Sequence, residues 1–468
     1  MRKTTLLLLS LWAGTTLCSG QQILTLEQCH ELAFHDNKQS QIDKENVEAA
    51  SDMRKAALAN FFPKFNANAA YMYNDTKAHI LPQVMNLSDG GTLSDQGFGN
   101  WQPSTFIGEA ANAAIGDVYS EIYKQMTLDF THVMVGQVGV VQPIYVGGKV
   151  AETYKLSKAA ENLAKIKAVK NKGELIVSVD EAYWRVISVQ HKRTLADQYA
   201  KLLRQLLANV EAAEEAGLVT KADVLKVRVK LNEAESSLSK AENGLVLSKM
   251  ALCQMIGLDL TTDIQLDDSG LEEVLLTNDK LNIDDVLNRR NEIQMLTEAK
   301  RMAQSGVRLV GSTLQPNLVA SANYIITNPN VKDGFQNKFN GFFSAGVVLN
   351  VPIAHPNDIL MLKAAKHKAK TVDLQMDEAR EKIELQATQS MQKVIEANNN
   401  LIRAKANISH AEENMRFAQE AFDAGLCTAT DLMMAQTAWQ AACSEKIDAA
   451  IELRIAEVIF KKNTGKLQ

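Results

Sequence analysis

The sequence is poor in proline, cysteine and aromatic residues, and it has no long hydrophobic run. Only 8 of its 468 residues are proline, and 6% are aromatic. No run approaches 18 apolar residues beyond the N-terminus, so we expect no membrane-spanning helix in the mature chain. A net charge of -5 is small for this length and argues against a nucleic-acid-binding protein. If a chain without such a helix crosses a membrane, it must do so as strands of a closed barrel.

The sequence also lacks the residue patterns of common enzymes and metal sites. It has no GxSxG, HExxH or P-loop motif, and Gly147-Gly148-Lys149 lacks the glycine and hydroxyl residue that a P-loop needs. The eight histidines are dispersed, and the five cysteines show no C-x-x-C spacing. The cysteines are Cys18, Cys29, Cys253, Cys427 and Cys443. We therefore expect no catalytic residues, no cofactor, no metal and no disulfide scaffold.

The N-terminus has the pattern of an export signal. Arg2 and Lys3 precede a short apolar run from Leu6 to Leu17, and small residues follow it. This predicts a signal peptide over residues 1–20. Cys18 follows a bulky leucine, where a lipidation site would have a small residue, so lipidation is disfavoured but left open.

Two stretches 208 positions apart, Ala216 to Leu225 and Ala424 to Met433, share one pattern. In each, a glycine can end one helix in the left-handed conformation, and a threonine can cap the next helix. An aspartate at the third helical position completes the capping pattern. These residues are Gly217, Thr220 and Asp223 in the first stretch, and Gly425, Thr428 and Asp431 in the second. Each stretch therefore predicts the tight tip of a helical hairpin.

Landmark residues around the tips recur at nearly equal spacing. From Pro143 to Gly217 and from Pro352 to Gly425 there are 74 and 73 residues, and from Gly217 to Gly257 and from Gly425 to Gly465 there are 40 each. Such agreement indicates an internal duplication. We predict two copies of one unit, residues 21–258 and 282–468, joined by an equatorial linker over 259–281.

Each copy is predicted to run from a helix through two strands into a helical hairpin. The leading helices are expected over Leu26 to Asn60 and Ile283 to Ser312, each ended by a proline. The strands are expected around Phe65 to Tyr71, Thr131 to Ile144, Leu318 to Asn323 and Phe342 to Ile353. The first copy has an insertion within residues 74–131. Its composition predicts a long surface loop with a helical piece at Ile107 to Lys124.

The four strands are about as long as transmembrane barrel strands and alternate only weakly. Strands of a soluble sandwich are the alternative. Four strands cannot close a barrel, for which about eight are needed, and an open edge is not tolerated in lipid. If the strands lie in a membrane, several protomers must share one barrel.

The longest elements are two proline-free stretches, Lys149 to Ala216 and Asp358 to Ala424. As single helices they would extend about 100 Å. A heptad of large residues interleaved with small ones follows each tip, which indicates a close-packed coiled-coil seam. The heptad positions after the first tip are Val224, Leu231, Leu238, Leu245 and Leu252. The expected fold class is α+β, with long coiled-coil hairpins that form an α-helical barrel capped by a transmembrane β-barrel.

With these motifs the sequence resembles the TolC-type outer-membrane efflux proteins. The resemblance covers the whole mature chain and rests on LTLEQCHELA, FFPKFNANAAY, VVQPIYVGGK and the two tips. It implies a homotrimer with a twelve-stranded barrel in the outer membrane of a Gram-negative bacterium and a helical tunnel in the periplasm. It also implies a passive exit duct of a tripartite efflux pump or type I secretion system, served by a periplasmic adaptor and an inner-membrane transporter. The cargo stays open between drugs, other small solutes and polypeptides.

The resemblance also assigns roles to residues of the tips. Asp431 stands at the position of the first acid of a cation-favouring ring, and the second acid is replaced by Met434. An aromatic residue that holds the tip shut corresponds to Phe422, and a gating arginine to Cys427, with Asp223 as its partner. Adaptor docking is expected at both tips, at Gly217, Leu218, Val219, Gly425 and Leu426.

Two simpler interpretations stay open beside these. Asp223 and Asp431 can act only as helix caps, and Cys427 can be only a small filler. For the whole chain, the alternative is a soluble periplasmic coiled-coil protein with a structural or tethering role. The two strand hairpins argue against that alternative.

Overall fold

The computed structural model describes residues 23–75, 77–79, 118, 127–272, 281–330, 332, 336–353 and 356–467. The expected signal peptide and, apart from the single residue Val118, the helical piece expected in the insertion lie outside the described residues. The chain folds into two compact units. The first comprises residues 1–51, 159–301 and 370–468, and the second comprises residues 52–158 and 302–369.

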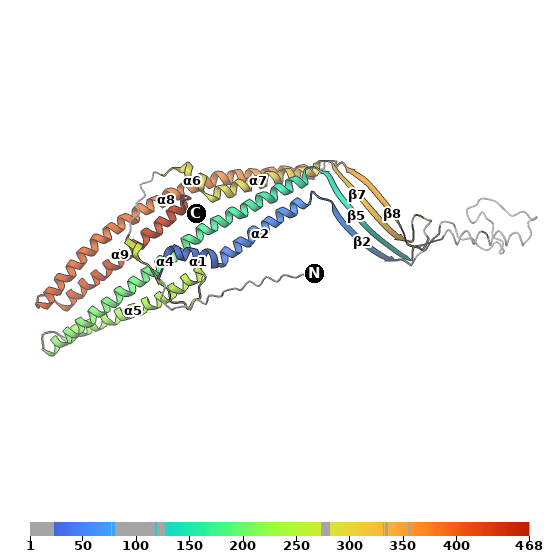
Figure 1. The fold of residues 1–468 in the computed structure, drawn as a ribbon. Helices are drawn as coiled ribbons and strands as arrows, with labels where there is room; N and C mark the ends of the chain where they lie inside the picture. The colour runs from blue at the N-terminus through green and yellow to red at the C-terminus, as the bar shows by residue number, and fades with distance from the viewer. Residues whose placement is uncertain are drawn as a thin grey trace, which may run out of the picture. The chain divides into compact units, whose positions relative to one another are not determined.

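The second unit contains a four-stranded antiparallel sheet (Figure 1). Its strands are β2 (Lys64–Tyr73), β5 (His132–Val146), β7 (Asn317–Asn328) and β8 (Asn340–Asn350), in the order β2-β5-β7-β8. All four predicted strands are present, although β8 ends three residues before the predicted Ile353. The two expected hairpins form, and β5 pairs with β7 to join them. A short ladder of β3 (Lys77–His79) and β4 (Thr127–Asp129) lies at the two borders of the insertion.

The register of the sheet places most of its large exposed apolar side chains on one face. Residues that pair directly across strands point to the same face. One face carries large apolar side chains that are between 40% and 83% exposed: Phe65, Tyr71, Tyr73, Met134, Val138, Tyr324, Ile326, Phe343, Val347 and Leu349. The opposite face carries the polar residues Asn66, Asn68, Gln137, Ser321, Asn323 and Ser344, together with the exposed Met72 and Val348. Gln137 donates a hydrogen bond to Asn323 there, at 2.8 Å. The exposed apolar face needs an apolar environment.

Two very long helices and two shorter ones form the helical hairpins (Figure 1). The long helices are α4 (Lys149–Glu215) and α8 (Pro356–Asp423), of 67 and 68 residues, or about 100 Å each. The returning helices are α5 (Lys221–Ile256) and α9 (Ala429–Asn463). All four were predicted, and the boundaries of the two long helices differ from the predicted ones by at most two residues. Among the described residues, no helix has both the length and the apolar character to cross a membrane.

The predicted seam after each tip is largely buried. In α5, Val224, Val227 and Leu252 are at most 1% exposed. In α9 the small residues of the seam are buried: Ala435, Ala442, Ala449 and Ala456. Small side chains at these positions allow neighbouring helices to approach closely, so the seam is core packing.

The leading helices are each broken into two, which corrects the prediction of continuous helices over residues 26–60 and 283–312. The first consists of α1 (Leu26–Asp36) and α2 (Lys38–Ala59), and the second of α6 (Ile283–Arg289) and α7 (Asn291–Gly311). The residue at each break, Asn37 or Arg290, is extended, with ψ of 130° and 123°. Neither break contains proline or glycine, which is why propensity did not reveal it.

Each break receives the end of a returning helix. The Asn37 side chain donates to the carbonyl of Met255 in the last turn of α5, at 2.8 Å. The buried Arg290 guanidinium donates to the carbonyl of Asn463 at the end of α9, at 3.1 Å, and to Glu292 at 2.9 Å. Both side chains thereby satisfy carbonyl groups that a helix end leaves without an intrahelical partner.

A glycine follows each of these helix ends and packs against the break. Gly257 and Gly465 have φ of 80° and 69°, and a β-carbon there would lie 2.4 Å from Asp36 and 2.7 Å from Arg289. Glycine is therefore required at both positions for conformation and for space.

The described part of the linker packs on the helices of the first unit. Strand β6 (Gln265–Leu266) pairs in parallel with β1 (Ile23–Leu24), a pairing that the sequence did not reveal. The Tyr183 hydroxyl of α4 donates to the carbonyl of Asp267 at 2.6 Å. Arg454 of α9 donates to the carbonyl of Gly270 in the short 3-10 helix η3 (Ser269–Glu272). The linker is therefore held by hydrogen bonds to its backbone.

Replacement of Arg290 by alanine should loosen the end of α9. The substitution removes charge-assisted hydrogen bonds and leaves buried carbonyls without partners, so opening of the last turn should become easier by about 1.5–3 kcal/mol. Hydrogen exchange of residues 458–467 measures this. Arg289→Ala is the control, because Arg289 is exposed and its guanidinium makes no hydrogen bond or ion pair within the described residues. Equal exchange in the two variants would contradict the role of Arg290.

Candidate functional site

The two hairpin tips have the same backbone geometry. Gly217 and Gly425 have φ of 74° and 71°. In the first tip the amide of Gly217 donates to the carbonyl of Glu214 at 2.8 Å, and the amide of Leu218 to that of Ala213 at 2.9 Å. The second tip repeats both bonds, at 2.9 and 2.8 Å. This pair of bonds is the Schellman motif, in which the left-handed residue is usually glycine.

A reciprocal capping box follows each glycine, as predicted. In the second tip the Asp431 amide donates to the Thr428 hydroxyl at 3.2 Å, and the Thr428 amide donates to the Asp431 carboxylate at 2.9 Å. In the first tip Thr220 and Asp223 make the same two bonds, at 3.4 and 3.3 Å. Both aspartates therefore act as capping residues, and any further role is added to this one.

The two capping aspartates differ in charge compensation. Lys226 lies one turn after Asp223 and forms an ion pair with it at 3.0 Å. The hydrogen bond from the Thr220 hydroxyl and then Lys226 lower the pKa of Asp223 to about 2. The equivalent of Lys226 in the second tip is Met434, which is 60% exposed. Asp431 consequently has no cationic partner within the described residues, and its pKa is lowered by hydrogen bonds from the hydroxyl and amide of Thr428.

The structure places Phe422 and Cys427 beside the core of the tips. Phe422 is partly buried against a cluster to which α4, α5 and α9 contribute. The Cys427 thiol donates to the carbonyl of Ala418 at 3.5 Å. Burial, and then the charge of Asp431, raise the pKa of Cys427, so this thiol is uncharged at neutral pH. Asp223, the expected partner of a gating arginine, is paired within its own helix instead.

Each tip presents one leucine almost completely to solvent. Leu218 is 80% exposed and Leu426 is 82% exposed, although both are large apolar residues. Val219, the next residue in the first tip, is partly buried against the same hydrophobic cluster as Phe422. The two tips therefore expose a large apolar side chain at equivalent positions.

The two hairpins pack against each other along the helices that adjoin the tips. The shared cluster contains Leu203 and Val210 of α4, Val227 of α5 and Leu432 of α9, all at most 1% exposed. The Tyr199 hydroxyl and the Thr437 hydroxyl are 3.0 Å apart and link α4 to α9. A groove of about 570 Å³ runs between α5 and α9, and its lining includes Lys226 and Met434. The structure therefore brings Met434 to the junction of the hairpins.

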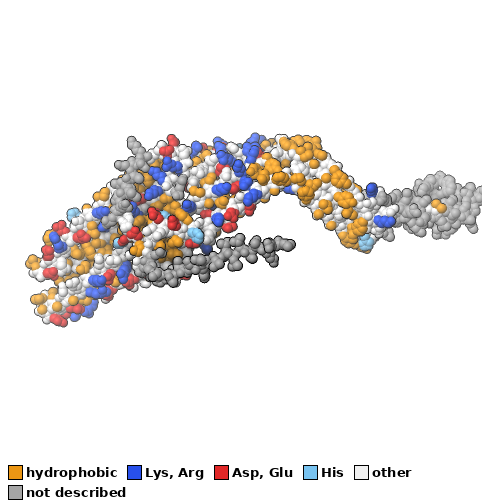
Figure 2. Space-filling view, in the orientation of Figure 1, with side chains coloured by type: hydrophobic (Ala, Val, Ile, Leu, Met, Phe, Trp, Pro, Cys, Tyr) orange, Lys and Arg blue, Asp and Glu red, His pale blue; other side chains and the backbone are white. Residues whose placement is uncertain are grey.

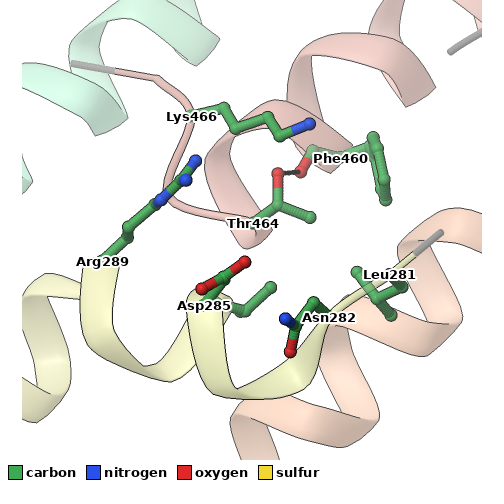
Figure 3. A pocket seen from close by; sticks show the side chains of 8 residues that line it. Leu281, Asn282, Asp285, Arg289, Phe460, Thr464 and Lys466 are labelled. Carbon is green, nitrogen blue, oxygen red and sulfur yellow. Dashed lines mark hydrogen bonds between the residues drawn. The ribbon is translucent and has the colours of Figure 1, made fainter. Parts of the chain in front are cut away.

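A polar pocket that the sequence analysis missed lies between α6 and the end of α9 (Figure 3). Its volume is about 280 Å³, and Asp285, Arg289, Thr464 and Lys466 are among the residues that line it. The Thr464 hydroxyl donates to the carbonyl of Phe460 at 2.8 Å (Figure 3). The pair of consecutive arginines was the signal for this pocket in the sequence. The structure buries Arg290 at the break of the leading helix and leaves Arg289 to line the pocket.

Comparison with known protein families finds a matching family for this chain. The family model described as outer membrane efflux protein matches residues 41–258 and 282–466. No curated protein sequence matches the chain.

Solved structures of outer-membrane channels share the fold. The Campylobacter jejuni CmeC outer membrane channel is 13% identical, with a TM-score of 0.72, over 94% of this chain and 85% of that one. The outer membrane protein VceC of Vibrio cholerae is 12% identical, with a TM-score of 0.71, over 94% and 96%. The MtrE outer membrane channel of Neisseria gonorrhoeae, captured in its open state, is 13% identical, with a TM-score of 0.71, over 94% and 88%.

The family match extends over most of the chain and agrees with the long helices and the two-faced sheet. It assigns the protein to the outer membrane of a Gram-negative bacterium, as the exit duct of an efflux pump. The role as a soluble tether is disfavoured accordingly. The chain belongs to the outer membrane efflux protein family.

Proposed function

We propose that three copies of this chain form one passive duct through the outer membrane and the periplasm. The observation that carries the proposal is the four-stranded sheet, which has one apolar face and two edges, β2 and β8, without a partner strand in the described protomer. In lipid, the backbone groups of such edges must find partners. Pairing of β8 with β2 of the next copy removes every edge, and three copies supply the twelve strands that the family resemblance implies.

The two faces of the sheet fit this assembly. The apolar face, with Phe65, Val138 and Phe343, would meet the hydrocarbon layer, and the face with Asn66, Gln137 and Asn323 would line a water-filled lumen. The helices would continue the lumen into the periplasm. Transport through such a duct needs no catalytic residue, since the inner-membrane transporter supplies the energy. A periplasmic adaptor would connect that transporter to the tips.

Reconstitution tests this assembly. We expect the purified protein to be a trimer by native mass spectrometry and to conduct ions in planar bilayers, because closure of the shared barrel leaves an aqueous path. A monomer that stays soluble without detergent, or a trimer without conductance, would contradict the proposal.

The proposed ring of three Asp431 side chains should favour cations. Asp431→Asn keeps the size of the side chain and removes its charge. The cation-to-anion permeability ratio should therefore fall by about tenfold, the lower end of the counter-ion enrichment in charged clefts. Reversal potentials in a salt gradient measure the ratio. Asp223→Asn is the matched control, because Lys226 already compensates that charge. If selectivity is unchanged in Asp431→Asn, Asp431 is only a helix cap.

The pH dependence of selectivity has a definite sign. Hydrogen bonds from Thr428 favour the ionised carboxylate and hold the pKa of Asp431 below its ordinary value of 3.8. The negative charge is therefore present above that value and is lost only as pH falls through the lowered pKa. Cation selectivity should persist at about pH 5 and decline only below about pH 4. A decline already at neutral pH would assign selectivity to another group.

The exposed leucines of the tips should bind the adaptor. In the double variant Leu218→Asn/Leu426→Asn, adaptor affinity should fall by about tenfold or more, because two large apolar side chains no longer become buried. Leu247→Asn is the control, since Leu247 is 66% exposed on α5 and lies away from the tip. Binding of the adaptor to trimers of each variant measures the effect. Equal loss in both variants would place docking elsewhere.

A further inference from the structure

The chain changes abruptly from apolar to basic where it leaves β8. Leu349, Val351 and Ile353 are 62%, 60% and 82% exposed, and Met361 in the first turns of α8 is still 56% exposed. The next exposed positions of α8 include Lys363 and Lys366, which share one side of the helix because they are three residues apart. The apolar surface that begins on the sheet therefore ends at a pair of lysines.

The first half of the chain repeats this arrangement. Ile144 and Tyr145 at the end of β5 are 57% and 48% exposed. They are followed on α4 by Lys155 and Lys158, both exposed. These lysines precede Lys363 and Lys366 by 208 positions, the spacing of the two tip glycines. We call Lys155, Lys158, Lys363 and Lys366 the basic collar.

Most of the charge of the basic collar is uncompensated. Lys155 forms an ion pair with Glu152 at 2.8 Å. Lys158, Lys363 and Lys366 have no ion pair or hydrogen bond from their side chains within the described residues. Elsewhere on the same helices some exposed lysines are paired, as in Lys382 with Glu378 at 2.5 Å, and others, such as Lys405, are not. The collar therefore presents free positive charge to whatever lies next to it.

The basic collar is close to the sheet along the chain, because Lys155 and Lys363 follow the ends of β5 and β8 by 9 and 13 residues. Figure 2 shows Lys and Arg side chains on the helices that adjoin the sheet, on the same visible face as the apolar side chains of the strands. The collar residues belong to the same compact unit as the sheet. An apolar surface bordered by lysines is the pattern of a protein surface at a membrane interface, where the aliphatic stems lie along the apolar layer and the ammonium groups reach the polar layer.

We propose that the basic collar binds the phosphate groups of anionic phospholipids in the periplasmic leaflet of the outer membrane. This inference rests on the proposed seating of the sheet in the membrane. Because the apolar surface must end where the hydrocarbon layer ends, the first turns of α4 and α8 stand at the depth of the headgroups. Each lysine there gains electrostatic attraction from an anionic lipid surface, and three copies of the chain surround the duct with such lysines.

Native mass spectrometry of the delipidated trimer, titrated with phosphatidylglycerol or with zwitterionic phosphatidylethanolamine, tests the proposal. The wild-type trimer should retain phosphatidylglycerol in preference to phosphatidylethanolamine. In Lys363→Gln/Lys366→Gln the retained phosphatidylglycerol should fall by about half, since two of the four collar lysines of each copy are lost. The control is Lys240→Gln/Lys405→Gln, which removes two exposed lysines of α5 and α8 that lie away from the sheet.

Two results would overturn the proposal: unchanged lipid retention in the collar variant, and an equal loss in the control variant. Unchanged retention together with a change of ion selectivity would place the lysines at the lumen. Conductance of the same samples separates this inference from the proposed function. If the wild-type trimer conducts but shows no lipid preference, only the collar is refuted. If it neither inserts nor conducts, the duct itself is refuted.

Discussion

Backbone amides and carbonyls at the edge of a sheet have no hydrogen-bond partner in a hydrocarbon layer, and this constraint governs the rest of the structure. The larger sheet of the described protomer has four strands, an apolar face and edges at β2 and β8. Alone it can neither close a barrel nor remain open in lipid. The proposed sharing of one barrel satisfies the backbone. The antiparallel pairing of β5 with β7 places both halves of the chain in one continuous wall, which such sharing needs.

The two tips show how one local motif can serve two purposes. Both have the same left-handed glycine, the same pair of closing hydrogen bonds and the same capping box. Their electrostatics differ at one position, because Lys226 neutralises Asp223 while the corresponding Met434 leaves Asp431 uncompensated. One difference between the two hairpins thus distinguishes a structural cap from a candidate charge of the constriction.

The ends of the returning helices determine where the leading helices break. The carbonyls in the last turn of α5 and α9 need donors, and Asn37 and Arg290 supply them from positions where the backbone is extended. These contacts join residues that are 218 and 173 positions apart in the chain. No local pattern marks such breaks, so propensity favours one continuous helix in both places.

The sequence alone determined the long helices, the four strands, the tip glycines and the capping aspartates, because each depends on neighbours in the chain: proline-free heptads, short alternating runs, and glycine and threonine at fixed spacing. It also placed Asp431 and Met434 at the tip. Only the tertiary structure decided the breaks at Asn37 and Arg290, and the border between apolar surface and collar lysines. Those features depend on which side chains the fold brings together and exposes, and spacing along the chain does not encode that.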